Sequence, residues 1–100
     1  MARSTIVQEY QQTTAFQPGA SIPLTQNAST LVVSANTARF QIWISNPSSS
    51  IVYLQLAATG AGSGKGIMLS ANSQIYFNTY IGAISAFTAG SGVALAIAEI

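Results

Sequence analysis

The sequence predicts an all-β protein: an antiparallel β-sandwich, jelly-roll-like or immunoglobulin-like, that follows an extended N-terminal arm. Two observations lead to this fold class. From residue 21 onward, short runs rich in Ile, Val, Leu, Tyr and Phe alternate with clusters of Gly, Ser, Asn and Pro, at the spacing expected of a sandwich. Several of these runs also have the two-residue period of half-buried strands. A chain of 100 residues fits one domain, which we place at residues 21–100, after an arm at residues 1–20.

The arm is rich in Gln and Thr, and its apolar residues are scattered. Such a segment cannot build a core of its own, so we expect it to lie on another surface through a few apolar anchors. These candidate interface residues are Ile6, Val7, Tyr10 and Phe16.

Eight short strands are predicted after the arm, and they leave no room for a long helix. Ala is abundant and favours helices, but the alanines are interspersed with Gly, Ser and Thr, and the Ile, Val, Tyr and Phe content favours strands. The predicted strands are 21–24, 30–34, 39–45, 51–56, 66–69, 73–77, 83–87 and 93–98.

The clearest predicted hairpin joins the runs 39–45 and 51–56 through the turn sequence at 46–50. In the first run Phe40, Ile42 and Ile44 share one face, and in the second Val52, Leu54 and Leu56 do so. The opposite faces carry Trp43 and Tyr53, which we expect to meet across the two strands and to form part of an interface.

The last run alternates large apolar residues with alanines. Its alanines either line an outward face that allows close approach of another backbone, or lie inside the domain against the second sheet. The longest uncharged run, 81–98, approaches the length of a membrane span, but Gly, Ser and Thr interrupt it, and two strands around a turn are the better interpretation.

Charge is the most unusual feature of the composition. Only five residues are charged, Arg3, Glu9, Arg39, Lys65 and Glu99, where a soluble domain has about a quarter. Uncharged polar residues replace them: 13 Ser, 9 Thr, 5 Asn and 8 Gln. Since a monomer normally keeps charges on its surface, we expect other copies or a larger assembly to cover much of this exterior, although a glycan-binding surface would also fit. Without a basic cluster, neither nucleic acid nor an anionic membrane is an expected partner.

The residues that most catalysis and metal binding require are missing. The chain has no Cys, His or Asp, so we expect no catalytic, metal or cofactor site and no enzymatic activity. A hydrolase that uses Glu9 and Glu99 is the remaining catalytic alternative. The Gly-rich segment 60–66 resembles a phosphate-binding loop but lacks its spacing, and we interpret it as a mobile surface loop between strands or, equally, as a contact loop with the interface candidate Lys65 at its tip.

Four aromatic residues could form a platform for sugar rings or could pack in a core or subunit interface: Trp43, Tyr53, Tyr76 and Tyr80. Packing is the more common use of such residues. Trp43, Tyr53 and Tyr80 are therefore interface candidates.

From residue 39 to the end, the sequence resembles small virion proteins of tailed bacteriophages. The likeness consists of a strand that runs into Asn46-Pro47, a Val-Tyr-Leu strand at 52–54, a Gly-rich loop, Gly66 with Leu69, Tyr76 and the segment 80–86. This resemblance implies a β-sandwich on the virion, as a head decoration (cement) protein or a head-fibre or tail module.

We therefore expect a decoration protein on the head surface, with the major capsid protein as its partner. It would form a homo-oligomer, with a trimer favoured, and its arm would reach across a neighbouring subunit. A receptor-binding or carbohydrate-binding module of a phage fibre is the alternative.

Overall fold

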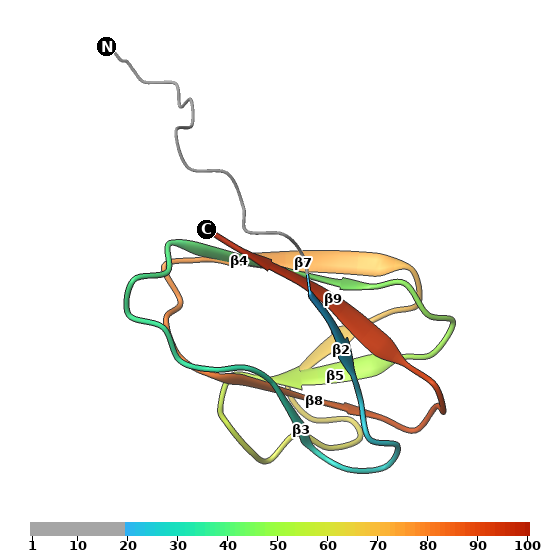
Figure 1. Ribbon diagram of the computed structural model, residues 1–100. Helices are drawn as coiled ribbons and strands as arrows, with labels where there is room; N and C mark the ends of the chain where they lie inside the picture. The colour runs from blue at the N-terminus through green and yellow to red at the C-terminus, as the bar shows by residue number, and fades with distance from the viewer. Residues whose placement is uncertain (1–19) are drawn as a thin grey trace.

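The computed structural model describes residues 20–100, which form two antiparallel four-stranded sheets packed face to face (Figure 1). In chain order the strands are β2 (Ala20–Pro23), β3 (Thr30–Val33), β4 (Gln41–Asn46), β5 (Val52–Gln55), β6 (Ile67–Leu69), β7 (Ser73–Asn78), β8 (Ile84–Thr88) and β9 (Ala94–Glu99). The predicted all-β sandwich and its eight strand positions are confirmed. The predicted arm lies outside the described residues, apart from Ala20, which begins β2.

The connectivity is that of a jelly roll. One sheet has the order β2-β9-β4-β7 and the other β3-β8-β5-β6. The pairs β2·β9, β3·β8, β4·β7 and β5·β6 are the successive rungs of one long antiparallel ribbon, which is rolled up by the pairings β4·β9 and β5·β8. This order distinguishes the jelly roll from an immunoglobulin-like sandwich.

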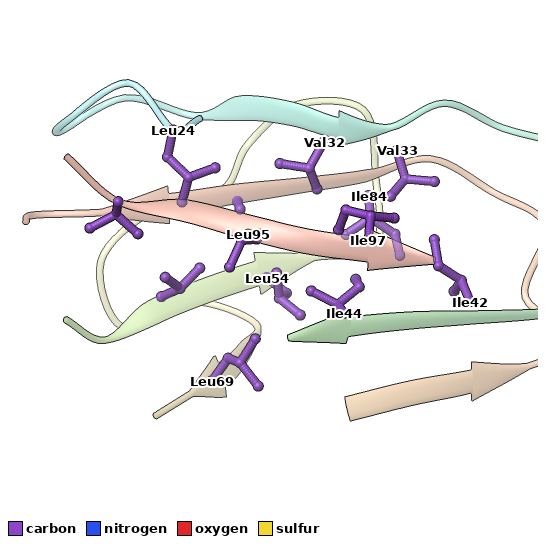
Figure 2. Close-up of a cluster of buried hydrophobic side chains, with 13 residues drawn as sticks. Leu24, Val32, Val33, Ile42, Ile44, Leu54, Leu69, Ile84, Leu95 and Ile97 are labelled. Atoms are coloured by element: carbon purple, nitrogen blue, oxygen red, sulfur yellow. The ribbon is translucent and has the colours of Figure 1, made fainter. Parts of the chain in front are cut away.

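The core lies between the sheets, and most strands contribute alternate residues to it, whereas β3, whose register shifts, contributes the adjacent Val32 and Val33. In Figure 2 the side chains of Ile42 and Ile44 on β4 point toward the other sheet, from which Leu54 and Ile84 point back. All four are fully buried. The run 81–98 folds as β8, a turn and β9, and within residues 20–100 no helix could cross a membrane.

The predicted hairpin between the runs 39–45 and 51–56 is wrong. β4 and β5 belong to different sheets, so Trp43 and Tyr53 lie on opposite outer surfaces of the sandwich and do not meet. The reason is that both runs bury their apolar faces in the same core, from opposite sides. The linker 46–50 therefore crosses from one sheet to the other.

Two residues of the predicted apolar faces are not buried with the others. Phe40 precedes β4 and is 75% exposed, and Leu56 follows β5 and is 42% exposed. Each belongs to the apolar period of its run but lies beyond the point at which the opposite sheet covers the strand.

Asn46 holds the crossing between the sheets. Its side chain is fully buried, and its Nδ2 donates to the carbonyl oxygens of Ser50 (2.8 Å), Leu69 (3.2 Å) and Ser70 (3.1 Å). Its Oδ1 accepts the backbone N–H and the hydroxyl of Ser48. One amide thus ties the start of the β4–β5 linker to its end and to the end of β6.

Arg39 performs the same task at the other end of the sandwich. Its side chain is fully buried, and its Nε lies 2.7 Å from the Glu99 carboxylate on β9. Its two terminal nitrogens donate to the carbonyl oxygens of Tyr80, Gly82 and Ser34. The guanidinium therefore joins the loops before β4 and before β8 to the C-terminal strand.

Candidate interaction surface

The outer face of the β2-β9-β4-β7 sheet is the most distinctive surface of the sandwich. The strand registers place Ala98, Trp43 and Tyr76 in one row across β9, β4 and β7. The next row contains Ser21, Ala96, Ser45 and Gln74. We call this surface the neutral face, and it comprises Ser21, Pro23, Gln41, Trp43, Ser45, Gln74, Tyr76, Asn78, Ala94, Ala96 and Ala98.

Methyl groups form the floor of this face because β9 alternates Leu and Ile with Ala. Val93, Leu95 and Ile97 are buried, whereas Ala96 is exposed. Of the two interpretations of the alanines, the outward one is therefore confirmed. A shallow groove of about 300 Å³ runs over Ala96 and Ala98 beside the Trp43 ring.

Aromatic rings and amides border the groove. The Trp43 and Tyr76 rings lie 5.8 Å apart at 44°, because the two residues are directly opposite on β4 and β7. Trp43 Nε1 donates to Gln74 Oε1 at 3.1 Å, and Gln41 Nε2 donates to Asn78 Oδ1 at 2.8 Å. These contacts hold the polar atoms in place and leave Trp43 38% and Tyr76 56% exposed.

The exterior of the sandwich carries few charges, because two of the few charged residues pair with each other. Three charged residues lie in the described part of the chain, and two of them, Arg39 and Glu99, form the ion pair at the end of the sandwich. Lys65 is exposed in the loop between β5 and β6. No charged residue belongs to the neutral face.

The other predicted interface residues do not gather on this face. Tyr53 is half-buried on the outer side of β5, beside a hollow that it shares with Ile51 and Phe87. Tyr80 packs against the core and donates its hydroxyl to the carbonyl of Ala83 at 2.7 Å, so it positions a loop. Ile6, Val7, Tyr10 and Phe16 lie outside the described residues.

The predicted aromatic platform is therefore divided. Trp43 and Tyr76 remain together, whereas Tyr53 is on the other sheet and Tyr80 belongs to a loop. The sequence analysis did not place Gln74 and Tyr76 next to Trp43. The alternation of exposed Gln74, Tyr76 and Asn78 with apolar residues in 73–78 was the signal for a face, but only the β4·β7 pairing brings that face to Trp43.

Among residues 20–100, no three side chains of the His, Cys, Asp or Glu type gather where they could hold a metal ion. The Glu99 carboxylate is bound to Arg39. Fold and surface together define a jelly-roll sandwich with an uncharged, partly aromatic contact face. Comparison with known proteins adds no identity, since no family model, curated protein or solved structure matches the chain.

Proposed function

We propose that this chain is a decoration (cement) protein of a tailed-bacteriophage head. It binds the assembled head surface of the virion, contacts the major capsid protein and bridges neighbouring subunits as a homo-oligomer, without catalysis or a cofactor. The resemblance of residues 39–100 to small phage virion proteins suggests the class. The jelly roll agrees with this class by analogy of fold alone, because both viral capsid domains and lectins have this fold.

The neutral face is the observation that supports this proposal most. Burying a charge against a partner requires stripping its water, which costs several kcal/mol unless a counter-charge is provided. Methyl and aromatic surface carries no such penalty, and each apolar Å² removed from water contributes about 25 cal/mol. A side-chain amide costs less to bury than a charge and can regain its hydrogen bonds from the partner. A face of alanines, Trp43, Tyr76 and amides is therefore suited to permanent cover by protein.

Stabilisation of the head follows from mass action. A protein that binds the assembled shell and not the free capsid subunits shifts the equilibrium toward the shell, and the shift grows with the occupancy of its sites. A binder with many copies can stabilise a shell through weak individual contacts, because it multiplies them over the surface.

A single charge on the neutral face should weaken this binding. We expect Ala96→Lys to reduce binding to heads prepared without the chain by at least about tenfold, since about 1.4 kcal/mol of uncompensated desolvation is enough. Ala58→Lys, on an exposed alanine of the β5–β6 loop, is the matched control and should bind like the wild type. The measurement is co-sedimentation with heads. Equal binding by the two variants would remove the neutral face from the proposal.

The arm can be tested separately. Deletion of residues 1–19 should abolish attachment to heads and leave the thermal unfolding of the sandwich cooperative, because the two sheets close without those residues. Heads that retain the truncated chain at wild-type occupancy would refute the role of the arm.

Carbohydrate binding is the second candidate, and the exposed Trp43–Tyr76 pair beside three side-chain amides favours it. An aromatic ring with polar neighbours suits the face of a sugar. A glycan array separates the two functions: specific binding that disappears in Trp43→Ala supports recognition, and an empty array supports cementing.

A further inference from the structure

The two sheets have four edge strands, and three of them carry a feature that discourages further pairing. β2 ends in Pro23, which has no N–H to donate. A register shift between Leu31 and Val33 interrupts β3, and β6 is three residues long. Prolines, irregularities and short length are the usual protections of sheet edges.

β7 has none of these protections. It has six residues, Ser-Gln-Ile-Tyr-Phe-Asn, without a proline or a charge, and it pairs with β4 in unbroken register from Ser73 to Asn78. It is the last strand of its sheet, so one side of its backbone has no neighbouring strand among the described residues.

The alternation of backbone hydrogen bonds along the sheet shows which N–H and C=O groups of β7 point toward that open side. Gln41 exchanges both backbone hydrogen bonds with Ile100, so its N–H and C=O point toward the C-terminal strand and away from β7. In an antiparallel ladder this direction alternates along each strand. The residues opposite Gln41, Trp43 and Ser45 therefore direct their backbone groups outward, and these are Asn78, Tyr76 and Gln74.

We propose that the β7 edge pairs with the β7 edge of a second copy of this chain, around a two-fold axis at Tyr76. The three outward-facing residues are spaced symmetrically about Tyr76. An antiparallel neighbour in this register therefore pairs Tyr76 with the partner's Tyr76, and Gln74 with the partner's Asn78, and every outward group gains a bond. The Asn78 carbonyl already accepts the Thr79 hydroxyl, and its second lone pair remains for the neighbour.

The side chains also favour a second copy over an unrelated strand. A two-fold contact places each residue near its own symmetry mate, where like charges would repel. β7 carries no charge. Directly opposed Tyr76 side chains instead form an aromatic pair, which extends the row of Ala98, Trp43 and Tyr76 into the same row of the partner. The neutral face becomes continuous across the dimer.

The size of the contact determines its strength. Stable dimers bury about 800 Å² per partner, which is more than three residue pairs along one edge supply. β6 borders the same side of the sandwich, with Met68 57% exposed, and enlarges the contact. We therefore expect a dimer that dissociates on dilution. This contact alone gives a dimer and not the trimer that the sequence analysis favours.

Cross-linking through a single introduced cysteine tests the geometry. The chain has no cysteine of its own. Opposed Cα atoms of a hydrogen-bonded antiparallel pair lie about 5.5 Å apart, within the roughly 4.4–6.8 Å span of a disulfide. Tyr76→Cys in the full chain should form a covalent dimer under mild oxidation. Ser21→Cys is the control, because Ser21 is exposed and faces outward at the protected β2 edge, and it should stay monomeric.

Variants of opposite charge at position 76 show whether this residue faces the same residue of the partner across the two-fold axis. We expect Tyr76→Lys and Tyr76→Glu each to sediment as monomers at concentrations at which the wild type is a dimer, with far-UV circular dichroism and melting behaviour that confirm folding. An equimolar mixture should recover the dimer, because Lys then faces Glu across the axis. A wild type that stays monomeric at every concentration or forms a trimer, or Tyr76→Cys that cross-links no faster than Ser21→Cys, would overturn the proposal. None of these outcomes depends on head binding, so the dimer and the decoration function fail or succeed independently.

Discussion

Replacement of Arg39 by Met should lower the free energy of unfolding by about 3–5 kcal/mol, the range seen when one partner is removed from a buried, hydrogen-bonded ionic group. A small domain has about 5–15 kcal/mol in total, so the variant should be close to the limit of folding. Urea denaturation monitored by Trp43 fluorescence measures the change.

The reason is that Arg39 satisfies three backbone carbonyls, at Ser34, Tyr80 and Gly82, in addition to the Glu99 carboxylate. Methionine fills similar space but donates no hydrogen bond. The carbonyl oxygens then stay in a poorly solvated site without a donor, at a cost of about 1–3 kcal/mol for each one that water does not reach.

Glu99→Gln is the control that separates the hydrogen bonds from the ion pair. The introduced glutamine can still accept the Arg39 Nε–H, and the Glu99 side chain is 36% exposed, so we expect this variant to lose less stability than Arg39→Met even though it leaves the buried guanidinium without a counter-charge. If the two variants lost equal stability, the ion pair and not the carbonyl contacts would be the stabilising element.

Asn46→Ala should cost about 3 kcal/mol, because the fully buried amide is lost from its bonds to the Ser50, Leu69 and Ser70 carbonyls, of which the Leu69 contact is buried and the other two are partly buried. The Ser48 hydroxyl also loses its shorter contact, to Asn46 Oδ1 at 2.7 Å, and keeps only the Ser50 carbonyl at 3.3 Å. Asn78→Ala provides a matched control: Asn78 is exposed and its side chain makes one hydrogen bond, to Gln41, so its loss should stay within about 0.5 kcal/mol. Similar midpoints of thermal unfolding for the two variants would contradict this role of Asn46.

The strands were predictable because burial imposes a two-residue period that is visible in the chain. Ile42 with Ile44, and Leu95 with Ile97, show it directly, and both pairs are in the core. The partner of each strand was not predictable in this way. A run with one apolar face fits a hairpin and a connection between two sheets equally well. At residues 46–50 the connection between sheets depends on Asn46, whose contacts with Leu69 and Ser70 are more than 20 residues away in the sequence.

The composition of the candidate surface could be predicted from the sequence, but its position on the fold could not. The scarcity of charge and the alternating alanines were evident in the sequence, whereas the role of Arg39 was not, because a lone arginine in a polar segment usually lies in solvent. Its burial removes one of the few charges from the exterior. Tyr76 gains its importance from the strand opposite and from its position at the edge, which only the registers reveal.

The copy number of this chain on purified virus particles tests the central claim most directly. A protein whose neutral exterior covers a head surface should be present in hundreds of copies per particle, with most of them released when the head dissociates. A dozen copies or fewer would place it at a vertex, neck or tail, and its absence from particles would contradict the decoration function altogether.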